Sequence, residues 1–332
     1  MGARRGQYAT RERHMIKDIA YAPPDPASSR GHLLDLYVPA DRDGPLPLVI
    51  WTGGSAWMAE NGREGADAVA ADLNPRGFAV AGVAIRSTAT TRFPGQLHDI
   101  KAAIRWLRAN AARHGLDPAR IGIMGDSSGG WTAAMAGVTG DIPELEGDIG
   151  VPGPAGGGPS SVVQAVVPFY PPTDFLRMDE QMPPGATAEF NRFVGTVDGH
   201  DDPRSPESLL LGGPIQAMTE AARQASPITY VRSGQPPFLI LHGRRDRLVP
   251  YGQSESLYEA ISSRGGTVTF VTLPHGEHGA WREFLTEPAI RHDARVRSSC
   301  DGRHDEARAM GPTWDTLADF FTAAFSGETT PG

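Results

Sequence analysis

The chain has 332 residues with a formal net charge of −8, and hydrophobic residues make up 39% of it, as in ordinary globular proteins. The acidic balance argues against a nucleic-acid partner or an anionic membrane surface, because both require clustered Lys and Arg. A single cysteine, Cys300, excludes an internal disulfide and lacks the surroundings of a catalytic thiol.

Residues 1–30 are polar and end in the turn-rich run "APPDPASSRG", so we expect an N-terminal extension there. This segment lacks the apolar core of a secretory signal, and no apolar run in the chain approaches the 18 residues that suggest a membrane helix. We therefore expect a cytoplasmic protein without a membrane partner. We expect residues 31–326 to form a single α/β domain.

Short apolar runs predict the strands of a covered sheet. "HLLDLYVP" (32–39) alternates like an edge strand, and the other runs read as buried strands. These lie at 47–51, 77–85, 120–125, 162–170, 237–243 and 266–274. Amphipathic spacing predicts helices at 93–115 and about 312–325, and a further helix opens after residue 127. Strands that alternate with helices indicate a mostly parallel sheet.

Two segments interrupt the alternation. Residues 175–228 are rich in Pro, Gly, Asp and Met, which predicts a cap inserted beside the site rather than a second globular domain. The cap's large apolar side chains predict an apolar pocket of limited size; they are Phe175, Met178, Met182, Phe190 and Phe193. Residues 283–311 are charged and irregular, and we expect a C-terminal insertion there.

"GDSSGG" (125–130) contains the pattern G-x-S-x-G between a predicted strand and a predicted helix. In that setting the flanking glycines allow a sharp turn that lifts the central side chain above the sheet. The pattern therefore favours Ser127 as a nucleophile over its neighbour Ser128. Chymotrypsin-like serine proteases carry a similar string, so the rest of the chain must distinguish the two folds.

A serine nucleophile needs a general base and a group that orients the base. Asp246 follows the strand "PFLIL", and His278 follows the next strand. The order Ser, Asp, His differs from the His, Asp, Ser order of chymotrypsin-like proteases and is that of α/β-hydrolases. His275 is the rival base, and Asp201 and Asp202 are distant rivals of Asp246.

The oxyanion of an acyl-transfer reaction needs preorganised hydrogen-bond donors. "WTGGSAW" (51–57) follows an early strand, so we expect backbone amides of Gly53 and Gly54 to reach the reacting carbon. The Ser128 amide completes the predicted oxyanion hole. Which two amides of Gly53, Gly54 and Ser55 face the oxyanion stays open.

Several side chains near these loops have two interpretations. Trp57 and Trp281 flank the predicted catalytic loops, where they either line the substrate pocket or belong to the core. Arg86 either contacts a substrate carboxylate or forms a structural ion pair with Asp99, and the ion pair is favoured. Neither interpretation of Arg86 makes it catalytic.

The sequence predicts no metal and no cofactor. His275 with His278, or "HDE" at 304–306, offers no complete set of three ligands. The phosphate-binding pattern G-x-x-x-x-G-K-[ST] is missing, and the glycines near residue 125 do not follow the dinucleotide-binding pattern.

Most of the chain, about residues 32–280, resembles bacterial carboxylesterases of the α/β-hydrolase superfamily. The resemblance is to the groups near hormone-sensitive lipase and the feruloyl or acetyl xylan esterases (BD-FAE), and it is carried by four runs. These are "FPGQLHDIKAAIRWLRANAARHGLDPARIGIMGDSSGG", "VVQAVVPFYPPTDF", "ASPITYV" and "PPFLILHGRRDRLVPYGQSESLYEAI". One departure is Thr52-Gly53-Gly54-Ser55, where such esterases usually begin with His-Gly-Gly.

The resemblance implies serine-dependent hydrolysis of a small-molecule ester by Ser127, Asp246 and His278, with Gly53, Gly54 and Ser128 as oxyanion donors. Two alternatives stay open. One is a serine peptidase or amidase of the same fold, which would need an acidic pair to hold a peptide amine; "DE" at 179–180 and "HDD" at 200–202 do not exclude it. The other is a binding protein on an inactive hydrolase scaffold. A homo-oligomer is possible.

Overall fold

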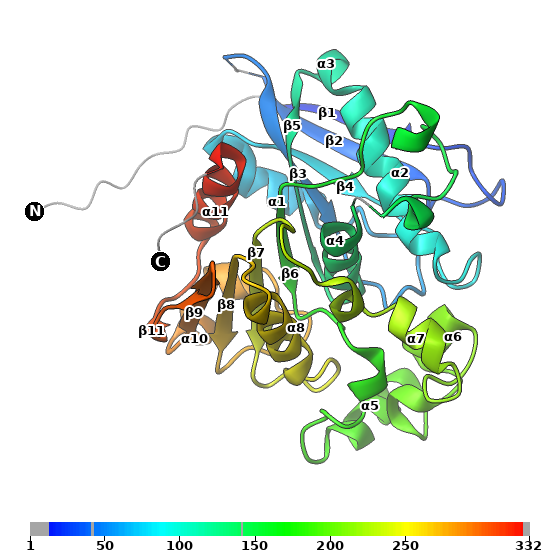
Figure 1. Cartoon of the computed structure of the whole chain (residues 1–332), viewed down its shortest axis with the longest axis vertical. Coiled ribbons are helices and arrows are strands. Elements are labelled where there is room, and N and C mark those ends of the chain that lie inside the picture. Colours follow the sequence, from blue (N-terminus) through cyan, green and yellow to red (C-terminus); the bar gives the residue numbers. More distant parts are fainter. Residues whose placement is uncertain (1–12, 41–42, 141, 328–332) are drawn as a thin grey trace, which may run out of the picture.

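A central sheet with helices on both faces organises the protein, and a computed structural model describes residues 13–40, 43–140 and 142–327 (Figure 1). The strands lie in the order β1-β2-β4-β3-β5-β6-β7-β8-β9-β10, and β11 also pairs with β9. The consecutive neighbours from β4 to β8 are parallel. The predicted α/β class, with a mostly parallel sheet, is confirmed.

The strands that the apolar runs predicted all form, with small shifts of their ends. They are β2 (Leu33–Pro39), β3 (Leu46–Thr52), β4 (Ala79–Val83), β5 (Leu116–Asp126), β6 (Ala165–Phe169), β7 (Phe238–Gly243) and β8 (Val268–Leu273). Because β5 to β8 are parallel, the loops after β5, β7 and β8 open at the same edge of the sheet. These loops carry Ser127, Asp246 and His278.

Three helices pack on one face of the sheet and two on the other. The first three are α2 (Gly95–Ala109), α4 (Ser128–Thr139) and α8 (Gly252–Ser263), whose apolar side chains share a buried cluster with the strands. The other two are α1 (Ala66–Leu73) and α11 (Trp314–Ser326). The helix predicted at 93–115 ends at Ala109, and its last turn is the separate α3 (Ala111–His114).

The sheet extends further at both ends than the sequence predicted. Within the segment expected as an extension, Arg13–Ala20 forms β1, which pairs antiparallel with β2, so β2 is not an edge strand. The part of residues 1–30 before Arg13 lies outside the described residues. Most side chains of β1 are exposed, and an exposed strand gives no apolar run in the sequence.

The segment 283–311 is also more regular than expected. It contains α9 (Glu283–Thr286), α10 (Pro288–Arg291), β9 (Arg295–Cys300), β10 (Arg303–His304) and β11 (Arg308–Ala309). Strand β9 pairs antiparallel with β8. The Arg297 guanidinium lies 4.4 Å from the centre of the Tyr258 ring, so a charged residue covers an apolar surface here.

Short helices fill the segment 175–228 that was predicted as a cap. They are η4 (Phe175–Arg177), α5 (Ala186–Val194), η5 (Gly199–Asp201), α6 (Pro206–Leu211), α7 (Thr219–Gln224) and η6 (Pro227–Tyr230). Figure 1 shows α5, α6 and α7 grouped apart from the helices that flank the sheet. The remaining short helices are η1 (Asn74–Arg76), η2 (Pro143–Leu145) and η3 (Pro154–Gly156). None of the described helices has the length and apolarity to cross a membrane.

Candidate active site

Ser127 stands in the sharp turn between β5 and α4. Its backbone has φ 54° and ψ −122°, a conformation that residues other than glycine rarely adopt. Its amide donates to the Phe169 carbonyl at 3.0 Å, and its own carbonyl accepts from the Trp131 amide at 2.9 Å. The strand on one side and the helix on the other thus hold a strained turn that presents the Ser127 side chain.

The turn requires glycine beside it because the backbone of β3 passes very close. A Cβ atom at Gly129 would lie 2.0 Å from the Thr52 carbonyl oxygen, and one at Gly125 would lie 2.5 Å from the same atom. The two glycines therefore let the nucleophile turn and the loop after β3 approach each other.

Replacing Gly129 by alanine should destabilise the fold by about 3 kcal/mol or more, because the clash is with backbone atoms that cannot move aside. Urea unfolding monitored by circular dichroism measures the loss. Gly153→Ala is the matched control, since its Cβ would meet only ordinary contacts at 3.6 Å from Glu146. Equal stability of the two variants would contradict this account of the turn.

The three residues proposed for catalysis form a chain of hydrogen bonds. His278 Nε2 lies 3.0 Å from Ser127 Oγ, and His278 Nδ1 lies 2.7 Å from Asp246 Oδ2. These distances suit a neutral imidazole that accepts the serine proton while the carboxylate fixes the tautomer. The residues come from the ends of three different strands, 151 and 32 positions apart in sequence.

Asp246 is fully buried and firmly held. Its Oδ1 accepts from the backbone amides of Leu248 and Val249, both at 2.9 Å. Burial opposes ionisation of the carboxyl group, but the charge of His278 and hydrogen bonds from His242 and His278 outweigh it and hold the pKa well below its usual range. Asp246 is thus a carboxylate at any pH at which the site would work.

His278 feels two opposing influences. Burial lowers the pKa of the imidazole, but Asp246, followed by the more distant carboxylates Asp126 and Glu207, raises it above the ordinary histidine value. The negative charges around the ring stabilise the imidazolium that proton transfer from serine would create.

The rival residues occupy other positions. His275 Nε2 lies 4.0 Å from Asp293 Oδ2, and its Nδ1 lies 3.3 Å from the Arg245 guanidinium. Asp202 forms an ion pair with Arg204 at 2.9 Å. Asp201 accepts from the Gln216 amide at 2.7 Å, so neither aspartate contacts His278.

The predicted oxyanion loop lies beside Ser127, but its two glycine amides have other acceptors. Gly53 N donates to the Gly62 carbonyl at 2.7 Å, and Gly54 N donates to Asp126 Oδ1 at 2.8 Å. A Cβ at Gly54 would lie 2.8 Å from the Ser127 Cβ, so glycine is needed there for close approach. In this structure the glycines shape the loop, and their N–H groups donate to acceptors within the protein.

Two other amides border the nucleophile. Ser128 is the first residue of α4, so the helix itself leaves its amide without an acceptor. The Ser55 amide donates to Ser128 Oγ at 2.9 Å. The Ser128 hydroxyl thus binds the loop after β3. The Ser128 amide, at the first residue of α4, has no acceptor within the helix.

Asp126 is a site residue that the motif reasoning passed over. Besides Gly54, its carboxylate accepts from the Tyr170 hydroxyl at 3.2 Å, and burial raises its pKa. Asp126 occupies the variable position before the serine in G-x-S-x-G, so the pattern itself gave no reason to single it out. It links the nucleophile turn, the oxyanion loop and the end of β6.

A pocket of about 360 Å³ opens at Ser127 and His278. Its walls combine the loop at 54–57 with cap residues and are mostly apolar; the apolar side chains include Trp57, Phe190, Phe193, Val194, Leu248 and Val249. Trp57 is 2% exposed and packs edge-on against Trp131, so it is both a core residue and part of the pocket wall. Of the expected cap side chains, Phe190 and Phe193 line the pocket, whereas Phe175 packs behind Trp57.

The remaining two candidates have structural roles. Trp281 packs against Trp51 with ring centres 4.4 Å apart and is not part of the pocket lining. Arg86 pairs with Asp99, its Nη2 lying 2.8 Å from Asp99 Oδ1, and His32 Nε2 lies 3.1 Å from the same oxygen. The ion pair favoured for Arg86 is therefore present.

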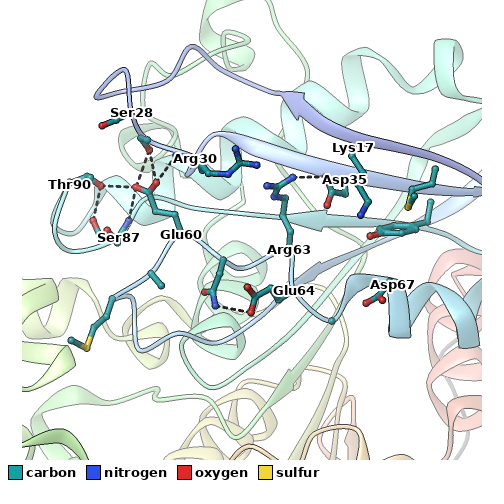
Figure 2. Close-up of a pocket in the computed structure, with 17 residues that line it drawn as sticks. Lys17, Ser28, Arg30, Asp35, Glu60, Arg63, Glu64, Asp67, Ser87 and Thr90 are labelled. Atoms are coloured by element: carbon teal, nitrogen blue, oxygen red, sulfur yellow. Dashed lines mark hydrogen bonds and ion pairs between the residues drawn. The ribbon is translucent and has the colours of Figure 1, made fainter.

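A larger cleft, of about 1090 Å³, lies between β1, β2 and the loop that leads from β3 to α1 (Figure 2). Several of its charged groups are engaged within the protein: Arg63 lies 2.6 Å from Asp35, and Glu60 accepts from the Arg30 backbone amide at 2.7 Å. Glu60 also accepts from the Ser29 and Thr90 hydroxyls. The cleft contains none of the three proposed catalytic residues.

The structure brings together one group of possible metal ligands that the sequence did not reveal. Atoms of His275, His292 and Asp293 lie within 4.8 Å of one another. Imidazole and carboxylate suit Zn²⁺. However, His292 and Asp293 are exposed and the Arg245 guanidinium lies beside His275, so we assign no metal to this group.

The sheet order and the Ser-His-Asp arrangement at the carboxyl ends of its strands define a hydrolase of the α/β-hydrolase fold. The BD-FAE family model matches residues 34–261. The chain therefore belongs to the BD-FAE family, and the resemblance found in the sequence is confirmed.

Known proteins similar to this chain include esterases. It is 31% identical to esterase LipC and 28% identical to the probable carboxylic ester hydrolase LipM, both of Mycobacterium tuberculosis, over 83% and 79% of its length. The matches cover 61% of LipC and 55% of LipM, so the chain spans little more than half of these relatives. A truncated carbohydrate esterase from gut microbiota is 29% identical with a TM-score of 0.75, and the match covers 96% of this chain and 98% of that one. The proteins that these matches name are thus esterases or ester hydrolases.

Proposed function

We propose that the protein hydrolyses small to medium carboxylic esters through an acyl-enzyme intermediate on Ser127. The observation that carries this proposal is the hydrogen-bonded chain from Ser127 through His278 to a buried Asp246, at the mouth of a mostly apolar pocket. The esterase relatives support the reaction class.

In the first step His278 Nε2 takes the hydroxyl proton of Ser127 as Oγ attacks the ester carbonyl. The resulting imidazolium then gives this proton to the leaving alcohol, and the acyl group remains on Oγ. Water, deprotonated by the same imidazole, attacks the acyl carbon; the bond to Oγ breaks, the acid leaves, and the imidazolium returns its proton to Ser127 Oγ. Asp246 keeps its charge throughout and stabilises the imidazolium.

The Ser128 amide is the first donor to the oxyanion, because α4 begins there and leaves the N–H directed at the turn. The Ser55 amide is already bonded to the Ser128 hydroxyl, so the further donor is the amide of Ala56, the next residue of the loop that lines the pocket. Gly53 and Gly54 give this loop its path. The positive end of the α4 dipole adds to the stabilisation of negative charge.

Hydrolysis of p-nitrophenyl esters from acetate to decanoate tests the proposed reaction. A pocket of about 360 Å³ predicts an optimum among short to medium acyl chains, with decanoate a poor substrate. Failure of the folded protein to cleave any member of the series would count against the esterase function.

The pH dependence of kcat/KM provides a separate prediction. The base must be neutral to accept the serine proton, and its neighbours raise the pKa of His278 above its usual value. Activity should therefore fall as the pH drops through a midpoint above about 6.5, the ordinary histidine value. Asp246→Asn should lower the midpoint because it removes the nearest negative charge. A native midpoint clearly below the ordinary value would contradict the assigned environment.

The peptidase alternative gains no support from the acids at 179–180 and 200–202. Asp179 accepts from the backbone amides of His200 and Asp201, and Glu180 pairs with Arg177 at 3.0 Å. These carboxylates are thus engaged away from a peptide amine. Cleavage of a panel of aminoacyl amides would reverse this conclusion.

A further inference from the structure

The wall of the pocket beside Ser127 contains a charged pair that the proposed reaction does not use. His200 and Glu207 both line it, yet their side chains are almost completely buried, at 0% and 3% exposure for the residues. His200 Nδ1 lies 3.1 Å from Glu207 Oε2. Burying a charged pair among apolar side chains costs free energy, so its presence in the wall of a pocket calls for a reason.

The pair is not needed to fix the cap loop. The Asp179 carboxylate accepts from the His200 and Asp201 amides at 2.9 and 3.0 Å, and the Ser205 hydroxyl donates to the His200 carbonyl. Ser205 also caps α6 by accepting from the Ser208 amide. The backbone that carries both side chains is therefore held independently of the pair.

The geometry leaves one carboxylate oxygen of Glu207 for the pocket. His200 is the one described partner of the Glu207 side chain, and it contacts Oε2. Oε1 is not among the fully enclosed polar atoms without a partner in the described part of the chain. On the other side of the pair, the His200 ring packs against the Phe190 ring with ring centres 3.9 Å apart and planes tilted by 37°, and this contact restricts the orientation of the imidazole.

The charge state of the pair indicates which ligand group suits it. Burial disfavours the imidazolium, but the charge of Glu207 and its hydrogen bond raise the pKa of His200 above the ordinary value. The raised pKa favours a proton on the His200 ring, which compensates the negative charge of Glu207. Such a pair offers a strong acceptor to a neutral hydroxyl and little net attraction for a cation.

We propose that Glu207, oriented by His200, is a specificity-determining acceptor that binds a hydroxyl group of the ester in the pocket. The preferred substrates are then hydroxylated esters, with the hydroxyl on the alcohol or on the acyl portion. Glu207 lines the same pocket as Ser127 and His278, and it lies close enough for its charge to act on His278. An ester bound for attack by Ser127 would therefore lie in the pocket that Glu207 borders. This inference rests on the proposed esterase function.

Two matched pairs of substrates test the proposal on the native protein. Ethyl butyrate and 2-hydroxyethyl butyrate differ by a hydroxyl on the alcohol, and p-nitrophenyl butyrate and p-nitrophenyl 3-hydroxybutyrate differ by one on the acyl chain. In at least one of the two pairs, the hydroxylated ester should have a kcat/KM about tenfold higher than its partner, as expected for a hydrogen bond to a charged group. No preference in either pair would overturn the proposal.

Variants then assign the preference to Glu207. Glu207→Met removes the acceptor and should abolish the preference, while Glu207→Gln keeps a neutral acceptor and should retain a part of it. In both variants activity on the unhydroxylated ester should fall less than activity on its hydroxylated partner, because the charge of Glu207 also acts on His278. Glu189→Gln is the matched control, because Glu189 is an exposed cap carboxylate paired with Arg247 outside the pocket. If Glu207→Met does not fold, a comparison of the substrate preference of Glu207→Gln with that of the native protein still tests whether Glu207 binds the hydroxyl.

The possible results separate this inference from the esterase function. Equal loss of activity on both esters of a pair would make Glu207 a purely structural residue and overturn the inference. Butyrylcholine, a cationic ester, cleaved better than 2-hydroxyethyl butyrate would make the pair an anionic site and likewise overturn it. If the native protein cleaves none of these esters, the esterase function itself fails.

Discussion

Replacing Ser127 by alanine should reduce ester hydrolysis by at least about 10⁴-fold, because Oγ supplies the bond to the acyl group and no nearby group can replace it. Ser127 Oγ is the atom that lies 3.0 Å from His278 Nε2. The measurement is kcat/KM on p-nitrophenyl butyrate, with circular dichroism to show that the fold is unchanged. The strained backbone at φ 54° belongs to the turn and does not require a hydroxyl.

Ser128→Ala is the matched control for this variant. Its hydroxyl accepts from the Ser55 amide, so its loss should loosen the oxyanion loop and reduce kcat by about tenfold, without abolishing the reaction. The Ser128 backbone amide is unchanged in this variant. If Ser128→Ala were as inactive as Ser127→Ala, the assignment of the nucleophile would be in doubt.

His278→Gln should have the second large effect, a loss of about 10³-fold or more, because glutamine cannot take the serine proton. Its side chain could still reach Ser127 and Asp246 by hydrogen bonding, which limits damage to the fold. Steady-state kinetics on the same ester measure the loss, and the residual rate should no longer depend on a group with the pKa of His278.

His275→Gln is the matched control for the base, three residues away in the same loop. Its ring faces Asp293 and Arg245, so we expect kcat/KM within about threefold of the native value. A large loss of kcat/KM in His275→Gln with little loss in His278→Gln would identify His275, and not His278, as the base.

The sequence was most informative where local patterns and chain order coincide. The apolar runs predicted seven strands, and the loops after three of them hold Ser127, Asp246 and His278. Because parallel strands end at one edge of the sheet, residues far apart in sequence could be expected to meet. Their hydrogen-bonded arrangement required the structure. A sequence pattern does not determine the side-chain rotamers, and it does not decide between His278 and His275 as the base.

The oxyanion loop shows where sequence patterns become insufficient. Two glycines after a strand indicated close approach, and close approach is found, with Gly54 beside Ser127. Which amides are free depends on where Asp126 and the Gly62 carbonyl lie, and these are long-range contacts. The substitution of the usual His-Gly-Gly start by Thr52-Gly53-Gly54 gave no information about them.

The exposed strands and the irregular segment 175–228 could not be predicted from the sequence either. Strands β1 and β9 carry many charged or exposed side chains, so no apolar periodicity distinguishes them from loops. His200 and Glu207 lie seven positions apart in a segment without regular periodicity, and only the folded cap buries them together in the pocket. Burial of a charged residue is a tertiary property that composition does not reveal.

The most direct test of the central claim is to locate the covalent intermediate. The native protein should be treated with a p-nitrophenyl alkylphosphonate, which forms a stable adduct with an activated serine, and then examined by intact-mass and peptide mass spectrometry. The account predicts one adduct per chain, carried by Ser127, with loss of esterase activity in proportion to labelling. An adduct on Ser128, or full esterase activity in a protein that remains unlabelled, would contradict it.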